Sequence, residues 1–478
     1  MSSRIVLINP PVPDEKVWVR EGRCQQWDIW GAPFPPLSLA LISTQLVKAG
    51  FETRIIDSGP QKKCLETVLA ECVAFAPMAA VIAAATPTIH TDLGWFLTEL
   101  KKKVPGIKAA VIGIHVSALP EETLLRYPDA DFAVMGEPEI TSRELISSLA
   151  EGRTGLSEIK GIAYRDDGRI KINPPRCWIE DLDSLGLPDW GKISFKDYPL
   201  PITGRPFSLI VFSRGCPFEC RFCATQAYNG QRVRRRSALS LLEEIRHNLS
   251  LGVSDFLFWT EQMTLDADSL NSFLDAVLAE GLNKKIKWVC NSRVDFADEA
   301  LFGKMREAGC WQIAFGFEFG DDRILRLAGK GGRSSIARSR AAAEAAAKAG
   351  LVVDGHFIIG YPGEDAETMR ATINLALSLP ITFAHFYAAV PFPGAKLYEE
   401  AVHNGWIEPS RWDRLNQDMP AITTDRLNPH LAGRYIRRAY RKFYFRPATA
   451  LRILRIPNGI KEFWKLFLIG IGFLRQVK

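Results

Sequence analysis

Short apolar runs alternate with longer amphipathic stretches along the first third of the chain. Fully apolar runs predict buried strands, and apolar residues spaced three and four apart predict helices. The expected strands lie at 4–9, 53–57, 79–85, 108–113 and 131–136. Helical patterns separate them, for example at 35–50 and 91–103. Apolar strands that alternate with helices predict a parallel sheet covered on both faces, so residues 1–150 are expected to form a doubly wound, Rossmann-like α/β domain.

A second series of strands and helices occupies residues 205–400. Its expected strands lie at 207–213, 255–259, 286–291, 311–317, 352–359 and 382–390. Six such units predict a partial (β/α)6 barrel, whose chemistry gathers at the carboxyl ends of the strands. Residues 151–204 are expected to form a hairpin around an Asp-Asp-Gly turn and a Pro-rich linker. Residues 401–478 are predicted to be helical and basic.

Three cysteines directly follow the first expected barrel strand. Cys216, Cys220 and Cys223 have the spacing C-x3-C-x2-C on a Gly/Pro loop, and no fourth Cys or His lies nearby in sequence. Ferredoxin-type clusters and structural zinc sites generally need a fourth ligand. The spacing therefore predicts a [4Fe–4S] cluster with one open iron, and a zinc loop or a chance triplet is the alternative. The other cysteines are expected to be buried and inert: Cys24, Cys64, Cys72, Cys177, Cys290 and Cys310.

With the aromatic Phe222 before its last cysteine, this loop and the barrel that follows it resemble the radical S-adenosylmethionine (SAM) superfamily. The resemblance implies that SAM binds the open iron and is cleaved to a 5′-deoxyadenosyl radical, with electrons from an external flavodoxin- or ferredoxin-type donor. Many relatives carry two adjacent acids after the second barrel strand, where this chain has Thr260 and Glu261. Glu318 is expected to meet the methionyl ammonium of SAM. The SAM-binding residues that the resemblance implies are Phe222, Glu261, Asn291, Arg293, Gly316, Glu318 and Gly360.

A doubly wound domain before such a barrel resembles the cobalamin-binding class of the same superfamily. The implied contacts lie on the loops after the strands: Asn9, Pro10, Thr86, Thr88, Gly113, His115, Gly136 and Glu137. The D-x-H-x-x-G motif, which supplies an axial histidine in many cobalamin proteins, is absent. We therefore expect cobalamin without a histidine ligand from that motif. The alternative is a degenerate domain that no longer binds cobalamin.

Charge is unevenly distributed in this chain of net charge +6, because residues 430–478 contain twelve Lys or Arg and one acid, Glu462. Arginines and aromatic residues alternate at helical spacing over 434–445, and the apolar stretch 463–474 is too short to span a bilayer. This pattern predicts peripheral contact with an anionic membrane surface. The alternative is a helix whose aromatic residues cap the barrel while its arginines pair with acids. No nucleic-acid partner is expected.

The predicted function is methylation of a carbon atom in a hydrophobic substrate such as a lipid, an isoprenoid or a tetrapyrrole. A radical oxidation, cyclisation or rearrangement without methyl transfer is the first alternative, as in the similar anaerobic Mg-protoporphyrin ester cyclase. A non-catalytic Fe–S or cobalamin-binding protein is the second. The N-terminus lacks a signal-peptide pattern, which predicts a cytoplasmic enzyme at or near the inner membrane surface. No catalytic base or substrate-binding residue is predicted.

Overall fold

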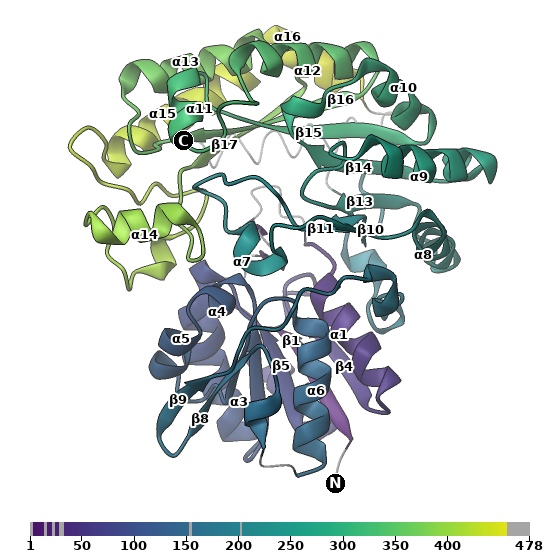
Figure 1. Cartoon of the computed structure of the whole chain (residues 1–478), viewed down its shortest axis with the longest axis vertical. Coiled ribbons are helices and arrows are strands. Elements are labelled where there is room, and N and C mark those ends of the chain that lie inside the picture. Colours follow the sequence, from purple (N-terminus) through teal and green to yellow (C-terminus); the bar gives the residue numbers. More distant parts are fainter. Residues whose placement is uncertain are drawn as a thin grey trace.

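Two α/β units are stacked along the long axis of the molecule (Figure 1). The structure is a computed structural model, and it describes residues 3–13, 17–21, 24–27, 33–152, 155–200 and 203–456. The carboxyl ends of the strands of the lower unit point toward the upper unit, and the short helix α7 (Thr225–Asn229) lies between the two. Both predicted units are therefore present.

The first sheet has the strand order β4-β1-β5-β6-β7-β8-β9. Its parallel strands are β1 (Arg4–Asn9), β4 (Glu52–Asp57), β5 (Ala79–Ala83), β6 (Lys108–Ile112) and β7 (Phe132–Val134). The strand order reverses between β1 and β5, and ligands of doubly wound sheets bind in the crevice at such a point. Its helices are α1 (Leu37–Lys48), α2 (Leu65–Phe75), α3 (Leu97–Lys103), α4 (Ile114–Ala118), α5 (Pro120–Arg126) and α6 (Pro138–Ala150). The predicted doubly wound domain is confirmed.

The hairpin that follows belongs to this first sheet. Strand β8 (Ile162–Asp166) pairs antiparallel with β7, and β9 (Arg169–Ile172) pairs with β8 at the edge. The buried start of β8 needs a hydrogen-bonding neighbour, and β7 supplies it. The stretch after the hairpin is not a loose linker either, because Trp190 is fully buried and Gln45 donates to the Leu185 carbonyl at 2.8 Å. Residues 155–200 are therefore integrated into the first unit.

The second sheet has the parallel strand order β10-β13-β14-β15-β16-β17, so it follows the chain. Helices lie on its outer side (Figure 1). This arrangement confirms the predicted partial barrel. Its strands are β10 (Phe207–Val211), β13 (Asp255–Trp259), β14 (Lys287–Ser292), β15 (Cys310–Glu318), β16 (Val352–Ile359) and β17 (Phe383–Ala388). Its longer helices are α8 (Ala238–Ser250), α9 (Ala267–Ala279), α10 (Glu299–Glu307), α12 (Ile336–Lys348) and α13 (Ala366–Ser378).

Short elements border the two sheets. The hairpin of β2 (Trp18–Glu21) and β3 (Cys24–Trp27) lies beside the first sheet, and the pair β11 (Ser213–Arg214) and β12 (Arg234–Arg235) encloses the cysteine loop. The short helices are α11 (Asp322–Leu327), α14 (Lys396–His403), the π-helix η2 (His90–Phe96), and the 3₁₀ turns η1 (Thr86–Thr88), η3 (Leu156–Glu158), η4 (Leu182–Leu185), η5 (Trp190–Lys192), η6 (Phe195–Asp197), η7 (Leu282–Lys284), η8 (Val294–Phe296) and η9 (Trp412–Arg414).

The C-terminal helix α15 (Pro429–Tyr444) packs its aromatic side on the barrel. Phe443 is fully buried, and the Tyr440 hydroxyl accepts a hydrogen bond from the Phe386 backbone N–H at 3.1 Å. These aromatic residues therefore cap the barrel, as the alternative expects, and membrane contact of the basic region stays a prediction. Four arginines on the other side are exposed and form no ion pair within the described part of the chain: Arg434, Arg437, Arg438 and Arg441.

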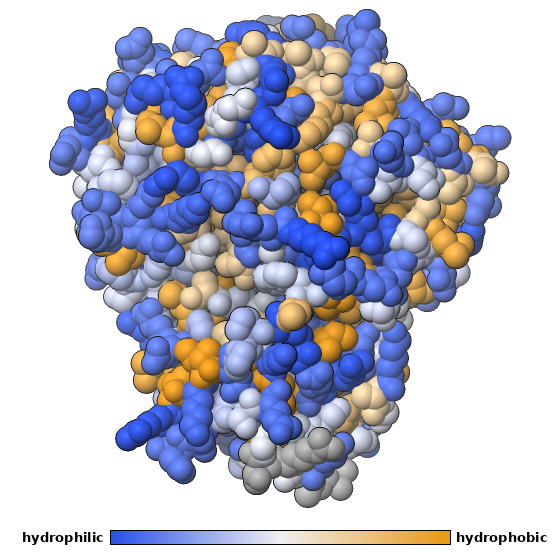
Figure 2. Space-filling view, in the orientation of Figure 1, coloured by the Kyte–Doolittle hydropathy of each residue, from blue (hydrophilic) through white to orange (hydrophobic). Residues whose placement is uncertain are grey.

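Helix α16 (Pro447–Leu454) follows, and the predicted apolar stretch 463–474 lies outside the described residues. Among the described helices, none combines the length and apolarity needed to cross a bilayer. Figure 2 shows a mainly hydrophilic face on which apolar residues form small, separate groups. Exposed arginines and the exposed apolar side chains of Phe445, Leu451 and Leu454 are therefore what remains of the membrane-contact pattern in the described residues.

The remaining cysteines divide into two groups. Cys72, Cys290 and Cys310 are buried as predicted, whereas Cys64 and Cys177 are exposed, so the prediction is wrong for these two. Cys64 immediately precedes helix α2, and Cys177 lies in the extended stretch after β9; neither position packs into a sheet. The side chain of Cys24 lies outside the described residues.

Candidate functional site at the facing strand ends

The cysteine loop lies between the two units and is fixed by backbone hydrogen bonds. The Cys216 N–H donates to the Gly230 carbonyl at 3.1 Å, and the Cys223 N–H donates to the Cys220 carbonyl at 3.0 Å. Gly215 has φ +95°, and a Cβ there would lie 2.1 Å from the Arg232 carbonyl oxygen, so only glycine fits. The loop therefore carries three free thiols on one short segment of the chain.

Burial makes two of these thiols, Cys216 and Cys223, poor thiolates on their own. Desolvation raises the pKa of Cys216 to about 12, and it also raises the pKa of Cys223. A coordinating metal deprotonates a thiol outright, because its positive charge replaces the lost hydration. The donor set thus fits an iron–sulfur cluster, which would supply that positive charge.

Arg293 joins the end of β14 to the cysteine loop. Its guanidinium donates to Cys220 Sγ at 3.3 Å and lies 4.1 Å from the centre of the Phe218 ring. Asp295 holds the guanidinium at 2.6 Å on the far side. The predicted SAM contact Arg293 is therefore committed in this structure to the sulfur.

Two further predicted SAM contacts lie beside the loop. Glu261 is buried after β13, where its carboxylate accepts from the Asn229 amide at 3.2 Å and from the Thr225 hydroxyl at 3.4 Å. The Phe222 ring contacts Phe319 edge-on at 6.5 Å between ring centres. The structure thus brings both residues to helix α7 and the cysteine loop.

Glu318 ends β15 in a strained backbone conformation. Its φ is +64°, which is uncommon for a residue with a side chain, and the pairing of β15 with β16 shifts register at this point. The carboxylate accepts from Lys330 Nζ at 2.7 Å, and only 12% of the Glu318 side chain is exposed. Lys330 also donates to the Gly316 carbonyl. Strain of this kind is held in place by surrounding contacts and is common at ligand sites.

Asn291 and Gly360 end β14 and β16. The Asn291 carbonyl accepts from the Met263 N–H at 3.0 Å, and the Asn291 side chain is half-buried. The Gly360 N–H donates at 2.8 Å to Glu364, a buried carboxyl whose pKa desolvation raises to about 8. All seven predicted SAM contacts therefore lie on the cysteine loop or at the carboxyl ends of barrel strands.

The facing edge of the first sheet contains the predicted cobalamin contacts. Asn9 and Pro10 are buried at the end of β1, and Asn9 Oδ1 has no hydrogen-bond partner in the described part of the chain. Gly113 follows β6 with φ +130°, where a Cβ would lie 2.2 Å from the Ala84 carbonyl oxygen. The buried Asn9 Oδ1 beside the topological switch point fits a polar ligand bound along this edge, whereas the glycine at position 113 is required by close contact with Ala84.

His115 lies inside the protein rather than at this surface. It is fully buried, its ring contacts Trp412 edge-on at 4.5 Å, and Nδ1 lies 3.3 Å from the Thr86 hydroxyl. Desolvation lowers the pKa of His115 to about 3, so the imidazole is neutral. The Thr88 hydroxyl is also committed, because it donates to Asp92 at 2.6 Å.

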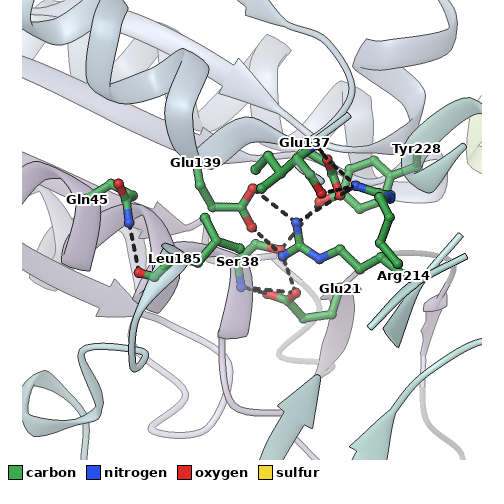
Figure 3. A network of polar contacts seen from close by, with 10 residues as sticks. Glu21, Ser38, Gln45, Glu137, Glu139, Leu185, Arg214 and Tyr228 are labelled. Carbon is green, nitrogen blue, oxygen red and sulfur yellow. Dashed lines mark hydrogen bonds and ion pairs between the residues drawn. The ribbon is translucent and has the colours of Figure 1, made fainter. Parts of the chain in front are cut away.

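Glu137, after β7, joins the two units through ion pairs. Its carboxylate accepts from Arg234 at 2.8 Å and from Arg214 at 3.2 Å, and Arg214 also pairs with Glu139 at 2.5 Å (Figure 3). Gly136 lies beside this network, where its Cβ position approaches the Trp178 ring to 3.4 Å. Arg214 belongs to β11, directly before the cysteine loop, so a buried ion-pair network connects the two facing edges.

The same network includes Glu21 of β2. Its carboxylate accepts from the backbone N–H of Ser38 at 3.1 Å and from the Ser38 hydroxyl at 2.7 Å, and the Ser38 hydroxyl lies 3.4 Å from the Tyr228 hydroxyl of α7 (Figure 3). Desolvation raises the pKa of Glu21 to about 8, so this carboxyl is largely neutral at pH 7. Residues of both units thus share one polar interface.

Comparison with known proteins agrees with this division of the chain. The model of the radical SAM superfamily matches residues 210–376, and that of the B12 binding domain matches residues 30–146. An uncharacterised methyltransferase of Pyrococcus horikoshii is 30% identical over 431 residues, covering 90% of this chain and 92% of that relative. The chain belongs to the radical SAM superfamily. Its cofactors are a [4Fe–4S] cluster, SAM and cobalamin.

Other members of the superfamily share the two-unit arrangement. The anaerobic magnesium-protoporphyrin IX monomethyl ester cyclase of Cereibacter sphaeroides is 26% identical, covering 91% of this chain and 71% of that enzyme. A solved structure of the radical SAM methyltransferase TsrM from Kitasatospora setae, with cobalamin and a [4Fe–4S] cluster bound, superposes with a TM-score of 0.67 at 18% identity. It covers 84% of this chain and 75% of that chain, and it shows the same fold.

Sequence reasoning missed several residues of this radical SAM enzyme. Arg214 and Lys330 had no motif to mark them, since each gains its role from a partner distant in sequence. Trp412 lies beyond the barrel, yet it is fully buried against His90 and His115 of the cobalamin domain. An isolated tryptophan in a polar stretch was the only available signal.

Proposed function

We propose that this enzyme transfers a methyl group to a carbon atom of a hydrophobic small molecule, at the interface of its two units. The observation that supports the proposal is the ion-pair network of Arg214, which joins the cysteine loop to the strand ends of the cobalamin domain. When bound, the cluster and SAM supply a 5′-deoxyadenosyl radical, and cobalamin supplies a methyl group. A site between the two edges serves both functions.

In this proposal Cys216, Cys220 and Cys223 bind the cluster. Arg293 places positive charge against Cys220. Glu318 receives the ammonium group of SAM, while Gly316 and Gly360 allow backbone approach. The exposed residues Pro217 and Glu219 border the loop and leave it accessible to an external electron donor of the flavodoxin or ferredoxin type.

On the facing edge, Asn9 and Gly113 contact cobalamin. His115 is not a cobalt ligand in this proposal, because its ring is enclosed by Trp412. In this proposal the exposed arginines of α15 contribute to contact with an anionic membrane surface. Binding to anionic vesicles that persists after Arg434, Arg437 and Arg438 are changed to Glu would remove that part of the proposal.

Incubation with trideuteromethyl-SAM tests the proposed function. The reconstituted enzyme is incubated anaerobically with reductant, cobalamin and the lipid-extractable fraction of cells, and the products are analysed by mass spectrometry. We expect 5′-deoxyadenosine, S-adenosylhomocysteine and a lipid-soluble product that carries the label. The Cys216→Ala variant is the matched control and should form none of them, since two thiols do not hold the cluster.

Two results would contradict the proposal in different ways. An unlabelled, oxidised or cyclised product would show the non-methylating alternative. A labelled product only from the water-soluble fraction would contradict the hydrophobic substrate while leaving methyl transfer intact.

The Glu318→Gln variant tests SAM recognition. The amide preserves the shape and still accepts from Lys330, but it loses the charge that pairs with the ammonium group. A charge-assisted hydrogen bond contributes about 1.5–3 kcal/mol, so the dissociation constant of SAM should rise about 10- to 150-fold with the cluster intact. Glu299→Gln, which alters an exposed ion pair with Lys348, is the control. Equal SAM affinity in the Glu318 variant would exclude this role.

Electron paramagnetic resonance of Co(II) cobalamin tests the axial ligand. The enzyme should bind one cobalamin per chain, and its spectrum should show no nitrogen splitting from a protein histidine, because Trp412 covers His115. The His115→Ala variant should give the same spectrum. Nitrogen splitting that disappears in this variant would identify His115 as a ligand, and failure to bind cobalamin would remove the proposed methyl donor.

A further inference from the structure

Three metal-ligating side chains meet on two neighbouring barrel strands, away from the cysteine loop. Asp354 and His356 are two residues apart on β16, and His385 of β17 is the register partner of His356. Because side chains alternate along a strand, all three share one face of the sheet. The intervening Phe357 stacks on Phe386 at 5.3 Å and lies on the other face.

The shared face is the inner one. Phe386, on the opposite face, packs edge-on against Tyr440 of the outer helix α15 at 5.2 Å. Asp354, His356 and His385 therefore point into the barrel interior. His356 and His385 keep 33% and 18% of their side chains exposed, so the group opens onto accessible space, whereas 8% of Asp354 is exposed.

The distances suit coordination of one ion. Asp354 Oδ2 lies 3.3 Å from His385 Nε2 and 3.8 Å from His356 Nε2, and one ligand atom from each residue lies within 4.8 Å of the others. Zinc bonds to nitrogen and carboxylate oxygen are about 2.0–2.2 Å long, so neighbouring ligand atoms in a tetrahedral site are about 3.3–3.6 Å apart. The Asp354–His385 distance lies in this range, and the Asp354–His356 distance of 3.8 Å is slightly longer.

The surroundings also support a ligand role. Gln312 of β15 donates to Asp354 Oδ2 at 3.2 Å, and Tyr387 stacks on His385 at 5.8 Å, so neighbouring groups orient both ligands.

We propose that Asp354, His356 and His385 bind one zinc-like divalent ion whose open coordination position faces the barrel interior and takes an oxygen, nitrogen or sulfur atom of the substrate. Three protein ligands and an open position are typical of zinc sites that bind a reactant. This inference rests on the proposed function and adds to it a substrate anchor, which selects molecules with a metal-binding group.

The position suits such an anchor. Asp354 pairs with Ala314 and His356 with Gly316, two to four residues before Glu318 on β15. At about 3.3 Å per residue, the site lies roughly 7–13 Å below the strand end. A substrate held here by one group can therefore present a distant carbon atom to the strand ends, where the cofactors bind.

Zinc binding to the cluster-loaded enzyme tests the inference. The reconstituted protein is treated with a chelator, desalted, titrated with Zn²⁺ alone and measured for metal content. We expect one zinc per chain, with X-ray absorption showing only nitrogen and oxygen neighbours. The His385→Gln and Asp354→Asn variants should bind zinc more than about 100-fold more weakly, since loss of an outer-shell partner alone costs 10- to 100-fold. His403→Ala, at the exposed end of α14, should bind normally.

Each other outcome overturns the inference. These are no zinc in the unmodified enzyme, zinc with sulfur neighbours as at the cysteine loop, or unchanged zinc affinity in both ligand variants. The Gln312→Leu variant guards against misfolding, because it keeps all three ligands and should weaken zinc about 10- to 100-fold. Zinc is measured without SAM or substrate, so its absence leaves the proposed function to its own test.

Discussion

The contact of Arg214 with Glu137 and Glu139 is the constraint on which the site depends. All three side chains are buried, and Arg234 adds a second guanidinium to Glu137. Burial alone would lower the pKa of Arg214, but Glu139 and Glu137 outweigh it and raise this pKa, so the charge persists. Buried ion pairs often add little net stability, whereas loss of one partner costs roughly 3–5 kcal/mol. Here these ion pairs hold the strand ends of the first sheet and the cysteine loop in a fixed relative position.

The same principle of paired burial recurs around the site. Lys330 forms an ion pair with Glu318, and Arg293 bonds both to Asp295 and to the Cys220 sulfur. Each charge has a specific partner, so the loops at the strand ends are held in place before any cofactor binds. Preorganised polar groups of this kind need little rearrangement when a ligand arrives.

Local sequence patterns predicted most of the fold. The apolar run at 4–9 and the Cys216 loop could be predicted because each depends only on residues that are close in sequence. Both lie where expected. The hairpin at 162–172 was misplaced because only the buried edge of β7 shows that it joins the first sheet. Glu137 was predicted to contact cobalamin because it follows a strand of the first sheet. Its ion pairs could not be predicted, since Arg214 and Arg234 lie far away in sequence. For the same reason the pairing of His356 with His385 became visible only through the register of β16 and β17.

The two units act as one site because this network aligns them. The yield of methyl transfer in an Arg214→Lys variant measures that alignment. Lysine keeps the charge but lacks the planar fork that reaches both carboxylates. With cluster and cobalamin contents equal to those of the unmodified enzyme, we expect at least about a tenfold fall in methylated product per 5′-deoxyadenosine formed. Arg246→Lys, in an exposed ion pair with Glu280, should leave that ratio unchanged. An unchanged ratio in the Arg214 variant would contradict the claim.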